Sequence, residues 1–345
     1  MALRLKKGEM FGFIKTLFAI ERKPRKGLLP AEWVVMIYLA ATSILMLLML
    51  SRLHEPWLMA WMRIKVVAIT LLFWAIYRMM PCRATLFLRI LVQMLMLAWW
   101  YPDTYELNRS LPNLDHLFAR WEQDLFGCQP ALLFSQAISN PIFSELMDLG
   151  YVSYYPMIVI VALYYFLARY EQFGRAAFVI LTSFFLYYVI FIILPVTGPQ
   201  FYYAAVSIED ISKGVFPNVT DWFATHQDVL ESPGYKDGLF YNLVADAHNT
   251  GERPTAAYPS SHVGISTILL LLLWNNNRSG KGKKHSKGSS SHALFYILLP
   301  FYVLLCFSTI YIMAHYVVDV FAGWISAVLF YFLTNVAYHA IDRKV

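Results

Sequence analysis

Apolar and polar stretches alternate along the chain, and the lengths of the apolar stretches predict membrane-spanning helices. A helix needs about 20 residues, within a range of about 17 to 25, to cross the apolar core of a bilayer. Most of the apolar segments reach this length, and the sixth is the weakest because polar residues complete both of its ends. The pattern predicts an all-α fold, a polytopic membrane helix bundle of about eight transmembrane helices. The apolar segments lie near residues 32–51, 64–80, 84–101, 150–168, 176–196, 260–277, 293–314 and 317–338.

Polar stretches separate these segments. Two long ones cover residues 102–149 and 197–259, and the run "NNNRSGKGKKHSKGSSSH" has the low-complexity composition of a solvated connector. The N-terminal stretch "FGFIKTLFAIERKPRK" mixes apolar and basic residues and is too interrupted to span. We therefore expect residues 1–30 to form a basic interfacial segment with no cleavable leader, and residues 31–345 to form a single integral membrane domain.

Composition supports a membrane protein and excludes several other classes. Hydrophobic residues make up 59% of the chain and charged residues only 14%, whereas a soluble domain has roughly 25% charged residues. Cys82, Cys128 and Cys306 are odd in number and lack metal-ligand spacing, so we expect neither a disulfide framework nor a zinc site. The chain contains no nucleic-acid-binding motif, and nothing in it indicates an oligomeric state.

The positions of the basic residues predict the orientation of the bundle. Lysines and arginines accumulate in cytoplasmic loops. With the N-terminus inside, the inner segments hold 20 of the 28 basic residues, and the outer loops hold most of the acidic ones. Both termini are therefore predicted to be cytoplasmic. In this topology Arg63 falls in an outer loop.

This topology brings two histidines to the same membrane face. His262 begins the sixth predicted span at its outer end, and His315 follows the seventh span at the same boundary. Asp319 is four residues after His315, the spacing that puts two side chains on one face of a helix. Among the acidic residues, only Asp319 lies within an apolar segment by sequence, and an ionisable group there is a functional candidate.

These residue types fit phosphoryl transfer without a metal or another cofactor. A neutral imidazole can attack phosphorus, a carboxylate on its other nitrogen fixes the tautomer, and a second histidine can protonate the leaving alcohol. The helix start at Ser260 and Ser261 offers backbone N–H groups to a phosphate. Arg253, a few residues upstream, offers a guanidinium clamp.

The two stretches that carry these residues resemble a known family. "YPSSH" and "STIYIMAHYVVD" are similar to the second and third motifs of the type 2 phosphatidic acid phosphatase superfamily, Pro-Ser-Gly-His and Ser-Arg-(five residues)-His-(three residues)-Asp. The resemblance implies that His315 becomes a phosphohistidine, that Asp319 orients it, and that His262 is the general acid. It also implies a catalytic core of the six-helix type at residues 150–338, to which residues 31–101 add N-terminal spans.

Departures from the family pattern point to one branch. Asp246 stands where the first motif has lysine, Thr309 replaces the arginine of the third motif, and Ser261 replaces a glycine. A site with fewer cations suits a singly charged phosphodiester better than a monoester, which carries close to two charges. With "LPVTGPQFYY" and "HYVVDVFAG", the chain is similar to the inositol phosphorylceramide and sphingomyelin synthase branch. The resemblance implies transfer of a phospho-headgroup from a glycerophospholipid to ceramide, with release of diacylglycerol, so the expected partners are membrane lipids.

Simpler interpretations exist for each of these residues. His262 can be a polar helix cap, and His315 with Asp319 a packing pair between helices. Arg253 can be an interfacial anchor, and Ser260 and Ser261 ordinary N-caps. For the whole protein, the alternatives are a lipid phosphate phosphatase that uses water as acceptor and, more distantly, a transporter with intramembrane ionisable groups.

Overall fold

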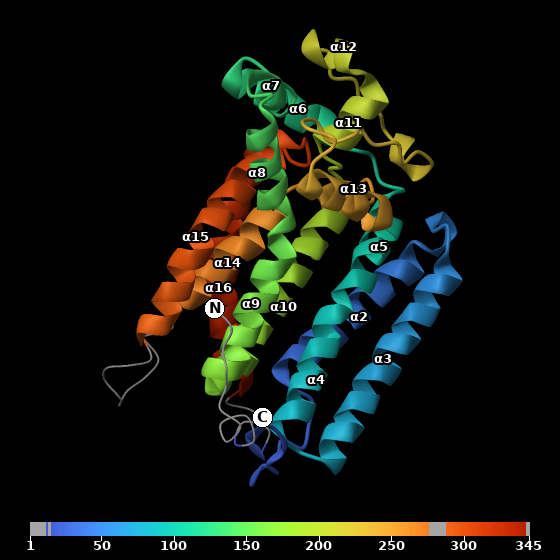
Figure 1. Ribbon diagram of the computed structural model, residues 1–345. Helices are drawn as coiled ribbons and strands as arrows, with labels where there is room; N and C mark the ends of the chain where they lie inside the picture. Colours follow the sequence, from blue (N-terminus) through green and yellow to red (C-terminus); the bar gives the residue numbers. More distant parts are fainter. Residues whose placement is uncertain (1–11, 13–14, 276–287, 343–345) are drawn as a thin grey trace.

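The fold was obtained as a computed structural model, which describes residues 12, 15–275 and 288–342. These residues form helices and contain no strands, which confirms the predicted all-α bundle (Figure 1). Part of the predicted N-terminal interfacial segment, residues 1–11 and 13–14, and most of the low-complexity run, residues 276–287, lie outside the described residues.

Six of the described helices are long and apolar enough to cross a membrane, with α4 and α5 counted as one span. A seventh candidate is the pair α8 (Pro141–Val152) and α9 (Tyr154–Ala168), which bends by 45°. The sixth predicted segment forms α14 (Ser261–Asn275), an apolar helix of only 15 residues. At 1.5 Å per residue it is about 22 Å long, less than the roughly 30 Å of a bilayer core. The six candidate membrane spans are α2 (Pro30–Leu48), α3 (Pro56–Met79), α4 with α5 (Arg83–Leu95 and Leu97–Asn108), α10 (Tyr170–Ile193), α15 (Gly288–Tyr311) and α16 (Val317–Asp342).

The helix α10 lies at the centre of the bundle. In the most apolar stretch of this helix, 72% of the residues are buried, a larger share than in any other candidate span of the described chain. It packs against α2 and α5 from the N-terminal group and against α9, α14 and α16 (Figure 1). The short helix α14 contacts α15 and α16 along its length, so neighbouring helices shield it on several sides.

The two long polar segments form short helices that gather at one end of the bundle, at the top of Figure 1. At this end α14 begins and α15 ends, so the segments that carry the two histidines meet under the short helices. The short helices of these segments are α6 (Asp115–Phe126), α7 (Pro130–Ala137), α11 (Pro199–Val206), α12 (Ile208–Ser212), η2 (Trp222–Ala224) and α13 (Leu239–Gly251). A separate short helix, η1 (Leu50–Arg52), lies between α2 and α3.

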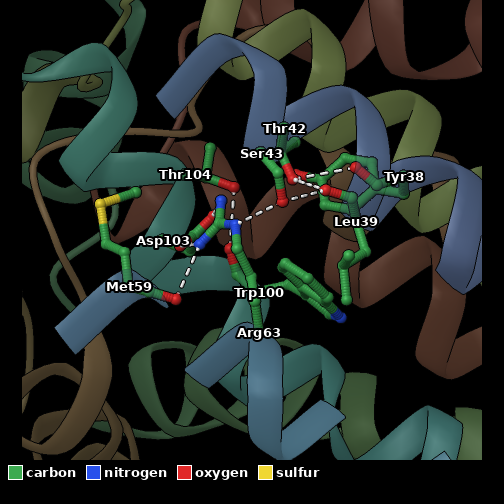
Figure 2. Close-up of polar contacts among 9 residues, drawn as sticks. All are labelled: Tyr38, Leu39, Thr42, Ser43, Met59, Arg63, Trp100, Asp103 and Thr104. Atoms are coloured by element: carbon green, nitrogen blue, oxygen red, sulfur yellow. Dashed lines mark hydrogen bonds and ion pairs between the residues drawn. The ribbon is translucent and has the colours of Figure 1, made fainter. Parts of the chain in front are cut away.

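Two buried ion pairs join the N-terminal helices. Arg89 of α4 lies 2.5 Å from Glu32 of α2, with neither side chain exposed. Arg63 of α3 donates two hydrogen bonds to Asp103 of α5, at 2.7 and 3.0 Å, and Figure 2 shows the guanidinium between Asp103, Ser43 and the Met59 carbonyl. The sequence prediction was wrong here: Arg63 lies in a helix rather than a loop, and Asp319 is not the only acidic residue in a spanning helix. Mutual pairing makes such burial tolerable.

Candidate active site

The histidines predicted from the sequence lie side by side. His315 Nε2 is 3.3 Å from His262 Nδ1, and the two ring centroids are 5.5 Å apart. His262 is the second residue of α14, and His315 lies in the turn between α15 and α16. The side chain of His315 is 4% exposed, whereas His262 is partly exposed. The pair therefore consists of one buried imidazole, His315, and one more accessible imidazole, His262, with a ring nitrogen of each facing the other.

Asp319 completes the group from the first turn of α16. Its Oδ2 atom lies 3.4 Å from His315 Nδ1 and accepts a hydrogen bond from the Tyr316 backbone N–H at 2.9 Å. The carboxylate therefore faces the nitrogen of His315 that points away from His262. The Asp319 backbone carbonyl accepts a hydrogen bond from Ser260 N at 3.0 Å, which ties the start of α14 to α16. The structure thus brings His262, His315 and Asp319 together.

The turn that carries His315 is held by the segment after α10. Gln200 N donates to the Met313 carbonyl at 2.8 Å, and His315 N donates to the Thr309 carbonyl at 2.9 Å. Gly198 has a φ of +93°, and a Cβ atom on it would lie 2.6 Å from the Ala314 carbonyl oxygen. Only glycine allows the two backbones to approach this closely next to His315.

Asp115, the first residue of α6, connects the same segment to the turn. Its carboxylate accepts hydrogen bonds from the backbone N–H groups of Thr197 and Gly198 at 2.7 and 2.8 Å, and from the Tyr316 hydroxyl at 3.2 Å. Thr197 Oγ1 and Asn113 Nδ2 also donate to it, and the side chain is fully buried. Sequence analysis assigned Asp115 to a polar loop and gave it no role. Its carboxylate therefore ties α6 and the segment after α10 to Tyr316, the residue next to His315.

Two tyrosines at the bend between α8 and α9 surround His262. The Tyr151 ring stacks on the imidazole with centroids 4.9 Å apart, and the Tyr154 ring lies 4.5 Å away at an angle of 48°. The sequence suggested only an interfacial or core role for these residues. One signal was present, since residues three apart share a helix face and the fourth predicted span begins on the same side as His262.

Glu252 is a further acidic residue beside the site that sequence analysis did not find. Its Oε1 accepts a hydrogen bond from the Tyr151 hydroxyl at 2.7 Å, and its Oε2 accepts one from Gln200 Nε2 at 2.6 Å. His248 Nε2 lies 3.4 Å from Oε1. The carboxylate therefore bridges the end of α13, the end of α8 and the start of α11.

The predicted phosphate ligands occupy different positions. The guanidinium of Arg253 is exposed and donates to Gln227 Oε1 at 3.1 Å rather than contacting an imidazole. Ser260 is buried, and its Oγ accepts a hydrogen bond from Val263 N at 3.3 Å, the geometry of an N-cap. Ser261 is partly exposed beside His262 at the first turn of α14. Within the described residues, no lysine or arginine bonds to either imidazole.

Burial dominates the electrostatics of the groups outside the spans. It lowers the pKa of His315 to about 4, against the opposing effects of the Ala257 backbone and the Glu252 charge. The imidazole is therefore neutral at physiological pH. Burial also raises the pKa of Glu122 to about 7, although the Val318 N–H donates to that carboxylate at 3.1 Å. In the described part of the chain, no cluster of three or more His, Cys, Asp or Glu side chains is arranged to hold a metal ion.

The family model described as the PAP2 superfamily matches residues 116–333, which is more than half of the chain and includes both histidines and Asp319. The chain belongs to the PAP2 superfamily. Comparisons with curated proteins and with solved structures gave no match. Membership supports a function of the lipid phosphatase or phosphotransferase type, and this PAP2 protein carries three additional spans before the matched region.

Proposed function

We propose that this PAP2 protein is a lipid phosphotransferase that moves a phospho-headgroup, such as inositol phosphate, from a glycerophospholipid to ceramide. The geometry of His262, His315 and Asp319 supports a phosphohistidine route without a metal. The absence of a bonded lysine or arginine at the imidazoles of the described chain supports a singly charged diester as donor. The distribution of basic residues supports a site on the extracytoplasmic face, with both termini in the cytoplasm.

The reaction proceeds in two balanced steps. His315 Nε2 attacks the phosphorus of the donor, the bond from phosphorus to the diacylglycerol oxygen breaks, and His262 gives a proton to that oxygen. The primary hydroxyl of ceramide then attacks the phosphohistidine, its proton passes to His262, and the bond from phosphorus to Nε2 breaks. Asp319 faces His315 Nδ1 at 3.4 Å and stabilises the positive charge that develops on the ring.

A single observation carries this proposal: Nε2 of His315 and Nδ1 of His262 face one another, while the carboxylate of Asp319 faces the opposite nitrogen of His315. The proposed proton donor, His262, therefore lies on the Nε2 side of the His315 ring. The proposed orienting group, Asp319, lies on the opposite, Nδ1 side. A phosphoryl group attached to Nε2 would lie within reach of His262.

The test uses purified protein in mixed micelles with labelled phosphatidylinositol and ceramide, and without added divalent metal. We expect release of diacylglycerol together with labelled inositol phosphorylceramide. His315→Ala and His262→Ala should each lower the rate at least about 1,000-fold. Turnover that persists in both variants would contradict the mechanism.

Two further measurements separate the alternatives. Release of orthophosphate from phosphatidic acid, without transfer of a headgroup to ceramide, would indicate a phosphatase with water as acceptor. Movement of a lipid across sealed vesicles without cleavage of any bond would indicate a transporter.

A further inference from the structure

Glu252 and Arg253 are neighbours in the chain, but their side chains face different surroundings. The Arg253 guanidinium bonds to Gln227, away from the imidazoles, whereas the Glu252 carboxylate bonds to Tyr151 and Gln200. Tyr151 in turn stacks on His262 with ring centroids 4.9 Å apart. An anionic group therefore occupies the side of this segment that faces the histidine pair.

The contacts of Glu252 are those of an ionised carboxylate. A tyrosine hydroxyl donates to Oε1 and an amide Nε2 donates to Oε2, so neither oxygen needs a proton of its own to complete these bonds. The side chain remains 20% exposed. The charge of Glu252 acts on both His262 and His315, and no lysine or arginine of the described residues bonds to either ring.

We propose that Glu252 is a specificity-determining residue that makes the histidine site select phosphodiester lipids over phosphate monoesters. The inference rests on the proposed function and deepens it by naming the charge class of the donor. A monoester carries close to two negative charges at neutral pH, and a diester carries one. The carboxylate repels each charge, so it disfavours the monoester more strongly.

The test compares diacylglycerol release from two lipids in mixed micelles that contain ceramide. Phosphatidic acid is the monoester, phosphatidylinositol is the diester, and diacylglycerol is the product common to both. The measured quantity is the ratio of kcat/KM for phosphatidic acid to kcat/KM for phosphatidylinositol. For Glu252→Gln, which keeps the shape and loses the charge, we expect this ratio to rise about tenfold.

Three control variants separate charge from structure. Tyr151→Phe removes the hydrogen bond to Glu252 and keeps its charge, and Glu252→Asp also keeps the charge, so both should retain the ratio of the natural protein. Glu231→Gln removes an exposed carboxylate that pairs with Lys236 and should leave the ratio unchanged as well. A purely structural role for Glu252 would lower turnover of both lipids equally and leave the ratio where it was, which would overturn the inference.

The outcome remains decisive if Glu252→Gln is inactive. In that case equilibrium binding of the same two lipids to the variant replaces turnover, and phosphatidic acid should gain about tenfold in affinity relative to phosphatidylinositol. No relative gain would overturn the inference. Failure of the proposed function gives a different result: the natural protein would release diacylglycerol without forming inositol phosphorylceramide, and the ratio would still report on Glu252. A natural protein that turned over phosphatidic acid faster than phosphatidylinositol would overturn the inference directly.

Discussion

His315 Nε2 lies 3.3 Å from His262 Nδ1, although 53 residues separate the two histidines in the chain. The contact joins the turn after α15 to the start of α14, and Asp319 lies behind His315 at 3.4 Å. This one relationship places the proposed nucleophile, the proposed proton donor and the proposed orienting carboxylate in a single group.

The carboxylate of Asp319 should matter only through His315. In Asp319→Asn the amide cannot stabilise the imidazolium or hold the required tautomer, so we expect kcat to fall roughly 10²- to 10⁴-fold. Because the two residues act as a unit, the double variant His315→Ala/Asp319→Asn should be no slower than His315→Ala alone. Rate measurements on the three variants check this, and independent, multiplicative losses would show that Asp319 acts separately.

The pH dependence of kcat/KM should reflect the burial of His315. Because burial lowers the pKa of this imidazole to about 4, it stays neutral and nucleophilic down to that pH. We expect the acid limb of kcat/KM near pH 4 rather than near the ordinary histidine value of about 6.5. The limb should persist in Glu122→Gln, since the pKa of Glu122 is about 7. An acid limb near 6.5 would mean that the ring is solvated.

The same pKa of His315 predicts the sign of its effect on stability. The unfolded chain binds a proton at this histidine below about pH 6.5, whereas the folded chain does so only below about 4. The contribution of neutral, buried His315 is therefore complete above about 6.5 and is lost as the pH falls toward 4. Thermal unfolding in detergent should show a smaller loss over this range for His315→Phe than for the natural protein.

Removal of Asp115 should loosen the turn that carries His315. Asp115→Ala leaves the buried N–H groups of Thr197 and Gly198 without their acceptor, which costs on the order of 3 kcal/mol in free energy of unfolding. We expect a lower thermal midpoint together with a loss of kcat. Asp210→Ala, which removes a partly exposed carboxylate that accepts a hydrogen bond from Ser207 Oγ, serves as the control. Equal midpoints for the two variants would show that the Asp115 network contributes little.

The ion pair between Arg63 and Asp103 should respond differently to single and double substitution. Arg63→Met leaves the buried carboxylate of Asp103 unpaired, and we expect a loss of roughly 3 to 5 kcal/mol in stability. Arg63→Met/Asp103→Leu removes both charges and should recover most of that loss. Denaturation of these two variants, of Asp103→Leu and of the natural protein in one detergent measures the coupling. If the double variant were as unstable as the single one, the hydrogen bonds to Ser43 and Met59 would outweigh the pairing.

Arg253 should contribute less to turnover than the histidines. Its guanidinium is exposed and bonds to Gln227, so Arg253→Ala should lower kcat/KM by less than about tenfold. The matched control is Gln227→Ala, which frees the guanidinium without removing it. A loss as large as that of His262→Ala would show that Arg253 turns toward the phosphate when the lipid binds.

Local patterns in the sequence were enough to predict the helices and part of the site. Segment length and hydropathy are properties of contiguous residues, and they located the spanning helices and the short α14. The spacing of His315 and Asp319 is also local, because a four-residue step within or next to a helix returns to the same face. The shared membrane face of His262 and His315 followed from counting spans.

Other features depended on how distant segments pack. The ion pairs of Arg63 and Arg89 were missed because each charge looked unfavourable until its partner on another helix was known. Asp115 looked like a loop residue because all its side-chain partners except Asn113 are supplied by segments more than 80 residues away. Tyr151 and Tyr154 resembled an interfacial belt, since hydropathy does not say which ring faces a neighbouring imidazole.

The sequence by itself therefore determined the all-helical membrane bundle and the identity of the histidines and Asp319, because residue type, segment length and helical spacing are encoded locally. Only the tertiary structure decided what surrounds them. The clearest case is Glu252 and Arg253: Glu252 has an extended backbone at the end of α13, where successive side chains point to opposite sides. The path of the chain between α13 and α14 fixed which of the two faces the imidazoles, and it placed the carboxylate there.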